Sequence, residues 1–309
     1  MRRRQERLGL GFAALCALNG AFVPAVAKLT TDRADPLFVA TATTCFGALA
    51  AAVVLGARGE LRQLADRRTA PGLVAIGALG TALAFLLFFA GAQRSSAIET
   101  VLCLQIESVY ALVLARIFLG HPMTPRRLAA VAGIVGGIAL ALNPSGFSGW
   151  VGVALLLATP LGWVVSHLIT LRALRGVPPR TLASARYLFG GAILTALWLA
   201  AGGASRLPPP AVLARLVPVL VLQGMLLSFV GTLFWYETIK RLDLARSTAI
   251  VVPSVPLLSL GASFLLLGEV AQPRQWLGLV LTATGVLAFV TAPHSTAPDL
   301  PLAEHDVPG

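Results

Sequence analysis

The chain has 309 residues, of which 57% are hydrophobic and 12% charged, and its mean hydropathy is +0.82. Soluble domains are about 45–50% apolar and about 25% charged, so this composition excludes an ordinary soluble protein and indicates one embedded in lipid. The net charge of +11 does not indicate nucleic-acid binding, because the basic residues sit in short gaps between apolar runs, as topology signals do in membrane proteins.

Ten apolar runs follow one another along the chain. Runs of roughly 17–25 apolar residues have the length of a membrane-spanning helix. Short connections with helix breakers, such as Asp35-Pro36 and Asn143-Pro144, separate the runs. We therefore expect an all-α integral membrane protein with ten transmembrane helices, at residues 8–28, 37–57, 72–92, 97–118, 127–143, 150–171, 181–201, 212–236, 245–267 and 275–292.

The first run has features of a secretory signal, because three arginines precede it and Ala25-Val26-Ala27 resembles a cleavage site. Its length, about that of a bilayer, favours a retained helix instead. The segment 293–309 has no Lys or Arg and several prolines, so we expect a disordered cytoplasmic tail there.

Basic residues alternate between the two sides of the expected bundle. With the N-terminus inside, sixteen of the 24 Lys and Arg residues fall on the cytoplasmic side and six on the opposite side. Arg116 and Arg186 lie within spans. The positive-inside rule then places both termini in the cytoplasm, and the class of protein favours the bacterial inner membrane.

The chain contains the same layout twice. Residues 88–137 and 236–285 each show a polar turn, an apolar run ending in Leu-Gly, a short loop and a Gly-containing apolar run. Five spans per copy is an odd number, so the second copy must enter the membrane from the opposite side. We expect two inverted five-helix repeats, at 1–145 and 146–292.

Charged and polar side chains inside a span are costly and therefore point to function. Glu107 lies near the middle of span four, and Glu99 lies about 80° from it on a continuous helix. Gln105 and Tyr110 belong to the same span. The carboxylate of Glu107 would bind an amino-bearing solute or take up a proton, or it is simply hydrogen-bonded within the bundle.

Further candidates for a central cavity lie in both halves of the chain. Arg186 would bind a solute carboxylate, although it would equally reach the cytoplasmic surface by snorkelling. His167 in span six would relay protons or be satisfied locally. Asn19, Trp163 and Tyr187 are further cavity-lining candidates, whereas Trp150, Trp235 and Trp276 at span ends are expected to be interfacial anchors.

Prolines interrupt the pattern of three expected spans. A broken helix exposes carbonyl and amide groups that can line a polar cavity at membrane depth. We therefore expect breaks that act as hinges in spans one, six and nine, at Pro24, Pro160, Pro253 and Pro256. The alternative is a simple kink, tolerated because neighbouring groups satisfy the freed backbone. No His lies at metal-ligand spacing from the three cysteines, and we expect no metal and no cofactor.

Several segments resemble the EamA-type exporters of the drug/metabolite transporter superfamily. The resemblance is close at Val251-Val252-Pro253-Ser254-Val255-Pro256, at Leu267-Gly268-Glu269 and at the Thr181–Tyr187 segment around Arg186. The first half departs from it: His121 stands where the other copy has Glu269, and Thr43-Thr44 stands near the place of an Arg. The resemblance implies a ten-helix exporter of amino acids, other metabolites or drugs.

We therefore expect a secondary active transporter that exports small metabolites such as amino acids by alternating access, with proton exchange as one form of coupling. The alternatives are a channel or facilitator for small solutes and a drug-efflux carrier. An integral-membrane enzyme is disfavoured, because the chain has no catalytic motif and no soluble catalytic insertion. The expected partners are a small-molecule solute and the lipid bilayer; the oligomeric state is not set by the sequence, and a monomer is plausible.

Overall fold

The computed structural model describes residues 2–119, 124–143, 146–242 and 244–290. Within these ranges all regular secondary structure is helical. The elements of the first 143 residues are α1 (Arg2–Thr31), α2 (Pro36–Gly56), η1 (Leu61–Ala65), α3 (Ala70–Gly77), η2 (Ala78–Leu83), α4 (Ala84–Arg94), α5 (Ala97–Leu104), α6 (Glu107–Leu119) and α7 (Pro125–Ala141). They continue with α8 (Gly146–Ala173), α9 (Pro179–Ala200), η3 (Gly203–Arg206), α10 (Pro210–Val221), η4 (Leu222–Val230), α11 (Gly231–Leu242), α12 (Leu244–Leu267) and α13 (Pro273–Val290).

Eight helical segments of the described chain are long and apolar enough to cross a bilayer. They correspond to the expected spans except five and ten, which are represented by the 17-residue α7 and the 18-residue α13. The chain is therefore a helical multi-pass membrane protein, and the count of ten spans stays a prediction. His121 and the expected tail at 293–309 lie outside the described residues.

The breaks expected at the prolines are wrong, whereas the role of these prolines as hinges stays a prediction. Pro24, Pro160, Pro253 and Pro256 all lie inside continuous α-helices. A proline removes one backbone N–H and frees the carbonyl four residues earlier, and a neighbour can satisfy that carbonyl. At Pro256 the freed carbonyl belongs to Val252, and it accepts a hydrogen bond from Gln105 Nε2 at 3.4 Å.

Span four is broken instead, without a proline. α5 ends at Leu104 and α6 begins at Glu107, and between them the N–H groups of Gln105 and Ile106 bond to carbonyls three residues back. The angle expected between Glu99 and Glu107 assumed one continuous helix, so it does not apply.

Two further spans depart from α-helical winding. η2 lies in the third span and η4 in the eighth, and both are π-helices. A π-helix widens the turn and leaves carbonyls of its own ladder available to other donors.

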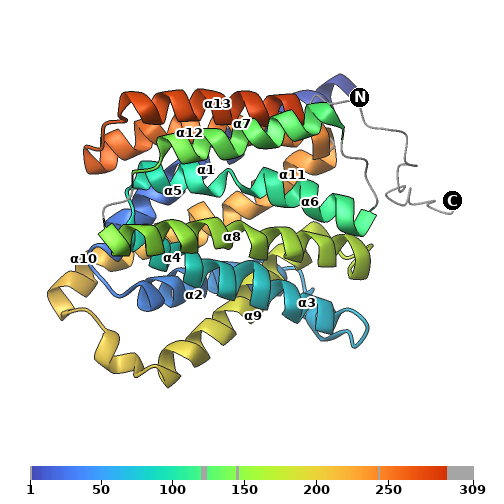
Figure 1. The fold of residues 1–309 in the computed structure, drawn as a ribbon. Helices are drawn as coiled ribbons and strands as arrows, with labels where there is room; N and C mark the ends of the chain where they lie inside the picture. The colour runs from blue at the N-terminus through green and yellow to red at the C-terminus, as the bar shows by residue number, and fades with distance from the viewer. Residues whose placement is uncertain (1, 120–123, 144–145, 243, 291–309) are drawn as a thin grey trace, which may run out of the picture.

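The helices pack in a set of long side-by-side pairs. α2 packs along α9, α4 along α8, α1 along α11 and α12, and α7 along α13. In Figure 1, α7 and α13 run together at the top of the view, whereas α9 lies at the bottom. The backbones of α7 and α13 approach closely at Gly137. A Cβ atom at this position would lie only 2.6 Å from the Gly278 carbonyl oxygen, so the close approach requires glycine.

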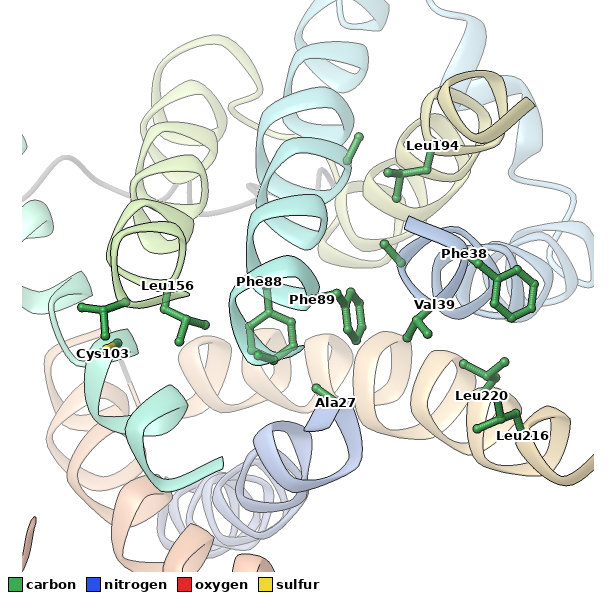
Figure 2. Packing of buried hydrophobic residues seen from close by; sticks show 14 residues of the cluster. Ala27, Phe38, Val39, Phe88, Phe89, Cys103, Leu156, Leu194, Leu216 and Leu220 are labelled. Carbon is green, nitrogen blue, oxygen red and sulfur yellow. The ribbon is translucent and has the colours of Figure 1, made fainter. Parts of the chain in front are cut away.

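The largest hydrophobic cluster lies where α1, α2, α4 and α8 meet. Phe88 and Phe89 of α4 occupy its middle, between Leu156 of α8 and Val39 of α2 (Figure 2). All four side chains are at most 3% exposed. This packing fixes α4 and α8, two of the helices that line the cavity described next.

Candidate functional site

A cavity of about 330 Å³ lies between the helices. Its described lining residues come from α1, α4, α5, α6, α8, α9, η4, α11 and α12, together with Gln105 at the break in span four. None of them comes from the α7–α13 pair. The volume is at the lower end of the range of about 300–1,000 Å³ that is usual for small-molecule sites.

Most of the polar residues singled out from the sequence line this one cavity. These lining residues come from both halves of the chain. Seven of the polar or aromatic residues predicted from the sequence line the cavity: Glu107, Gln105, Arg186, His167, Asn19, Trp163 and Tyr187. Of the prolines predicted as hinges, Pro24 also lines the cavity.

Glu99 and Tyr110 are absent from the lining. The Glu99 carboxylate accepts hydrogen bonds from the N–H groups of Ser96 (3.1 Å) and Asn143 (3.3 Å). With the Ser96 hydroxyl it forms a capping box at the start of α5. Glu99 thus has a structural position, at the end of a helix and outside the cavity.

Glu107 is the first residue of α6, so the break in span four brings its side chain to the cavity. The N-terminus of a helix favours negative charge through the helix dipole. At α6 the N–H groups of Ser108 and Val109 are already bonded to the carbonyls of Gln105 and Ile106. The carboxylate is half-buried, and in the described residues it forms no ion pair.

Arg186 reaches the cavity from α9 and is anchored on η2. Its Nη2 donates to the Gly80 carbonyl at 2.6 Å, and its Nε has no hydrogen-bond partner in the part of the chain that is described. Gly80 permits this approach, because a Cβ there would lie 2.7 Å from the Cβ of Ser166 and 3.4 Å from Arg186 Nε. The guanidinium therefore keeps donors for a further partner.

Asn19 makes the matching contact on the other π-helix. Its Nδ2 donates to the Leu227 carbonyl of η4 at 2.7 Å. Each π-helix is thus held by a cavity-lining side chain from the other half of the chain: η2 by Arg186, and η4 by Asn19.

A hydroxyl pair completes the polar part of the lining. Tyr187 Oη and Thr232 Oγ1 are 3.0 Å apart, and Thr232 also donates to the Ser228 carbonyl at 2.8 Å. The Tyr187 ring packs edge-on against Phe85 and Phe229. These contacts fix the phenol at the cavity wall.

Sequence reasoning missed Ser228, Thr232 and Trp235. Trp235 was expected at the membrane interface but lines the cavity, whereas Trp150 and Trp276 are 60% and 48% exposed. The spacing of the three residues, at i, i+4 and i+7, places them on one helical face and could have indicated a shared wall.

The described residues contain no group of three or more His, Cys, Asp and Glu side chains that could hold a metal ion. The cavity instead offers single charges of both signs, hydroxyls, amides and aromatic rings. Such a lining suits reversible binding of a small organic solute.

Membrane-length helices around an internal cavity with charged walls define a multi-pass membrane protein of the solute-carrying class. The model of the EamA-like transporter family matches residues 7–143 and 150–291. The chain belongs to that family, and it is therefore a transporter of the drug/metabolite transporter superfamily and not an enzyme.

The chain is also similar to a named relative and shares its fold with a solved structure. The chain is 29% identical over 240 residues to a protein of Streptantibioticus cattleyicolor named "Probable terminal-alkyne amino-acid exporter", covering 77% of this chain and 78% of the relative. A solved crystal structure matches with a TM-score of 0.63 at 16% identity, over 94% of this chain and 98% of the other. The latter likeness shows the fold alone.

Proposed function

We propose that this transporter is a secondary active carrier of the bacterial inner membrane that exports amino acids or similar small metabolites in exchange for protons. One observation carries the proposal: the Glu107 carboxylate and the Arg186 guanidinium line the same cavity without an ion pair between them among the described residues. Opposite charges held apart in a low-dielectric site suit a solute that bears both charges itself.

Each charge has a distinct part in binding. Arg186 donates one hydrogen bond to the Gly80 carbonyl. Its remaining N–H groups bind the solute carboxylate in the planar geometry of the guanidinium group. Glu107 binds the solute ammonium or a proton, but not both at once. Competition between ammonium and proton for one carboxylate couples the two fluxes, because release of the solute leaves the carboxylate free to be protonated.

Alternating access follows from the arrangement of the chain. We propose that residues 1–145 and 146–292 are inverted halves, with both termini in the cytoplasm. The packing of α1 on α11 and of α4 on α8 supports this, because each pair joins the first span of one half to the third span of the other. Exchange of the two halves' conformations would then open the cavity to the opposite side.

The named relative favours an amino acid over a drug as the solute, because it is named as an amino-acid exporter.

The test is uptake of labelled amino acids into proteoliposomes with and without a pH gradient. We expect saturable uptake that the gradient accelerates in the native protein and that Glu107→Gln makes insensitive to the gradient. Glu99→Gln is the matched control: it makes the same change in the same span, outside the cavity, and should behave like the native protein.

Three results would count against the proposal. Unsaturable flux would indicate a channel. Gradient-driven uptake that persists in Glu107→Gln would remove that carboxylate from coupling. No flux of any amino acid, with the protein folded, would exclude this substrate class.

A further inference from the structure

The cavity has two chemically different ends. Arg186 and His167 come from α9 and α8, whereas α1, α11 and α12 contribute Cys16, Trp235, Val251 and Val255. Those four residues, here called the apolar wall, belong to one hydrophobic cluster. In Figure 1, α12 lies near one edge of the bundle and α9 near the opposite edge.

Two side-chain amides near the apolar wall are already engaged in hydrogen bonds. The Asn19 amide donates to the Leu227 carbonyl, and the Gln105 amide donates to the Val252 carbonyl. A polar or charged group placed against the wall would therefore lose its water and find no free amide donor in return.

We infer that the transported solute has an apolar side chain that rests against the wall formed by Cys16, Trp235, Val251 and Val255, which makes these residues the specificity determinants. The inference rests on the proposed function, because the charged end must hold the amino-acid head group. The orientation follows from polarity: the ammonium and carboxylate reach Glu107 and Arg186, and the side chain points away from them.

Because Val255 packs closely against α1, a larger residue at this position tests how the size of the solute side chain affects binding. A Cβ on Gly20 of α1 would stand 3.3 Å from a methyl group of Val255, so this valine is in contact with the facing helix. Extra volume at residue 255 must then project into the cavity. Each methylene buried against the wall strengthens binding roughly fourfold, until the space is filled.

The first experiment is competition against labelled L-leucine uptake by the native protein in proteoliposomes. We expect the concentration for half-inhibition to fall from L-alanine to L-valine to L-leucine. L-Glutamate and L-lysine should compete at least about tenfold less well than L-leucine, because the four wall residues carry no charge and the two nearby amides are already hydrogen-bonded.

The second experiment changes the wall itself. Val255→Phe should raise the KM for leucine at least about tenfold more than the KM for alanine, whereas Val255→Ala should admit larger side chains such as that of phenylalanine. Val280→Phe makes the same change on an exposed face of α13, where the native side chain is 55% exposed, and should alter neither KM.

A third readout uses the native thiol of Cys16 and does not depend on wall variants folding. In a Cys45→Ser background, L-leucine should slow labelling of Cys16 by a small methanethiosulfonate, and L-lysine should not. Cys103 is buried and outside the lining, so it does not compete for the reagent.

The outcomes distinguish failure of the apolar-wall inference from failure of the proposed transport function. Lysine or glutamate competing as well as leucine, or an equal loss of leucine and alanine uptake in Val255→Phe, would overturn the apolar wall while leaving an amino-acid carrier. Absence of uptake and competition for every amino acid would overturn the proposed function and the inference together.

Discussion

Glu99 and Glu107 lie eight residues apart, and their neighbours give them different tasks. The Glu99 carboxylate accepts two backbone N–H groups and closes the start of α5, whereas Glu107 faces the cavity at the start of α6. A carboxylate occupied by backbone donors is a structural group. One that faces a cavity without an ion pair is available to a solute.

Glu99→Ala should therefore lower stability and spare substrate affinity. Loss of a helix cap costs about 1 kcal/mol, and here the N–H groups of Ser96 and Asn143 lose their acceptor. The measurement is the thermal midpoint of the purified protein, paired with KM. A midpoint equal to that of the native protein, or a large change in KM, would contradict the structural role.

Some residues of the site could be predicted from the sequence and others could not. Glu107, Arg186 and His167 are visible because ionisable groups are rare in spans. Thr232 and Ser228 are not, because a hydroxyl in a helix can donate to the backbone carbonyl four residues earlier, as Thr232 does to Ser228. Glu99 differs from Glu107 by its capping box with Ser96, a local pattern that could have indicated its structural role, and by the tertiary neighbour Asn143, which no local pattern indicates.

Among the helix pairs, α2 and α9 are joined at both ends by ion pairs. Asp35, at the N-cap of α2, pairs with Arg206 beyond the end of α9 at 2.9 Å. Glu60, beyond the end of α2, pairs with Arg180 in the first turn of α9 through two contacts of 2.6 Å. This clamping favours α2 and α9 as a unit that moves together, and of the two only α9 contributes to the cavity lining.

A double-mutant cycle at Glu60 and Arg180 tests that clamp. The Arg180 side chain is 42% exposed, so solvent screening limits the coupling to about 1 kcal/mol or less. Glu60→Gln and Arg180→Gln should each lower the thermal midpoint slightly, and the double variant should lose less than the sum. Strict additivity would show that the two side chains are not coupled.

At the scale of elements, helix existence is predictable and helix interruption is not. Long apolar runs identify the spans because lipid requires a satisfied backbone. The break at Gln105 and the π-helices η2 and η4 depend on partners elsewhere in the chain, such as Val252, Arg186 and Asn19. Proline was a misleading signal for the same reason, since its freed carbonyl can be satisfied by another helix.

For the whole molecule, the side of the membrane on which each loop lies remains a prediction from charge. Reporter fusions at Gly59, between α2 and η1, and at Gly202, between α9 and η3, examine it directly. We expect a cytoplasmic signal at Gly59 and an external signal at Gly202, because the basic residues concentrate on the first side. Signals from the same side at both positions would rule out the proposed topology.

The central claim is that one cavity binds both charges of an amino acid. Equilibrium binding of labelled L-leucine to the purified protein tests it most directly, with isoamylamine and 4-methylpentanoate as competitors that each keep only one of the two charges. We predict saturable binding that L-leucine displaces at least about tenfold better than either analogue, and that Arg186→Lys weakens because ammonium lacks the planar fork. Displacement by either analogue as effective as by L-leucine, or binding unchanged in both Arg186→Lys and Glu107→Gln, would contradict it.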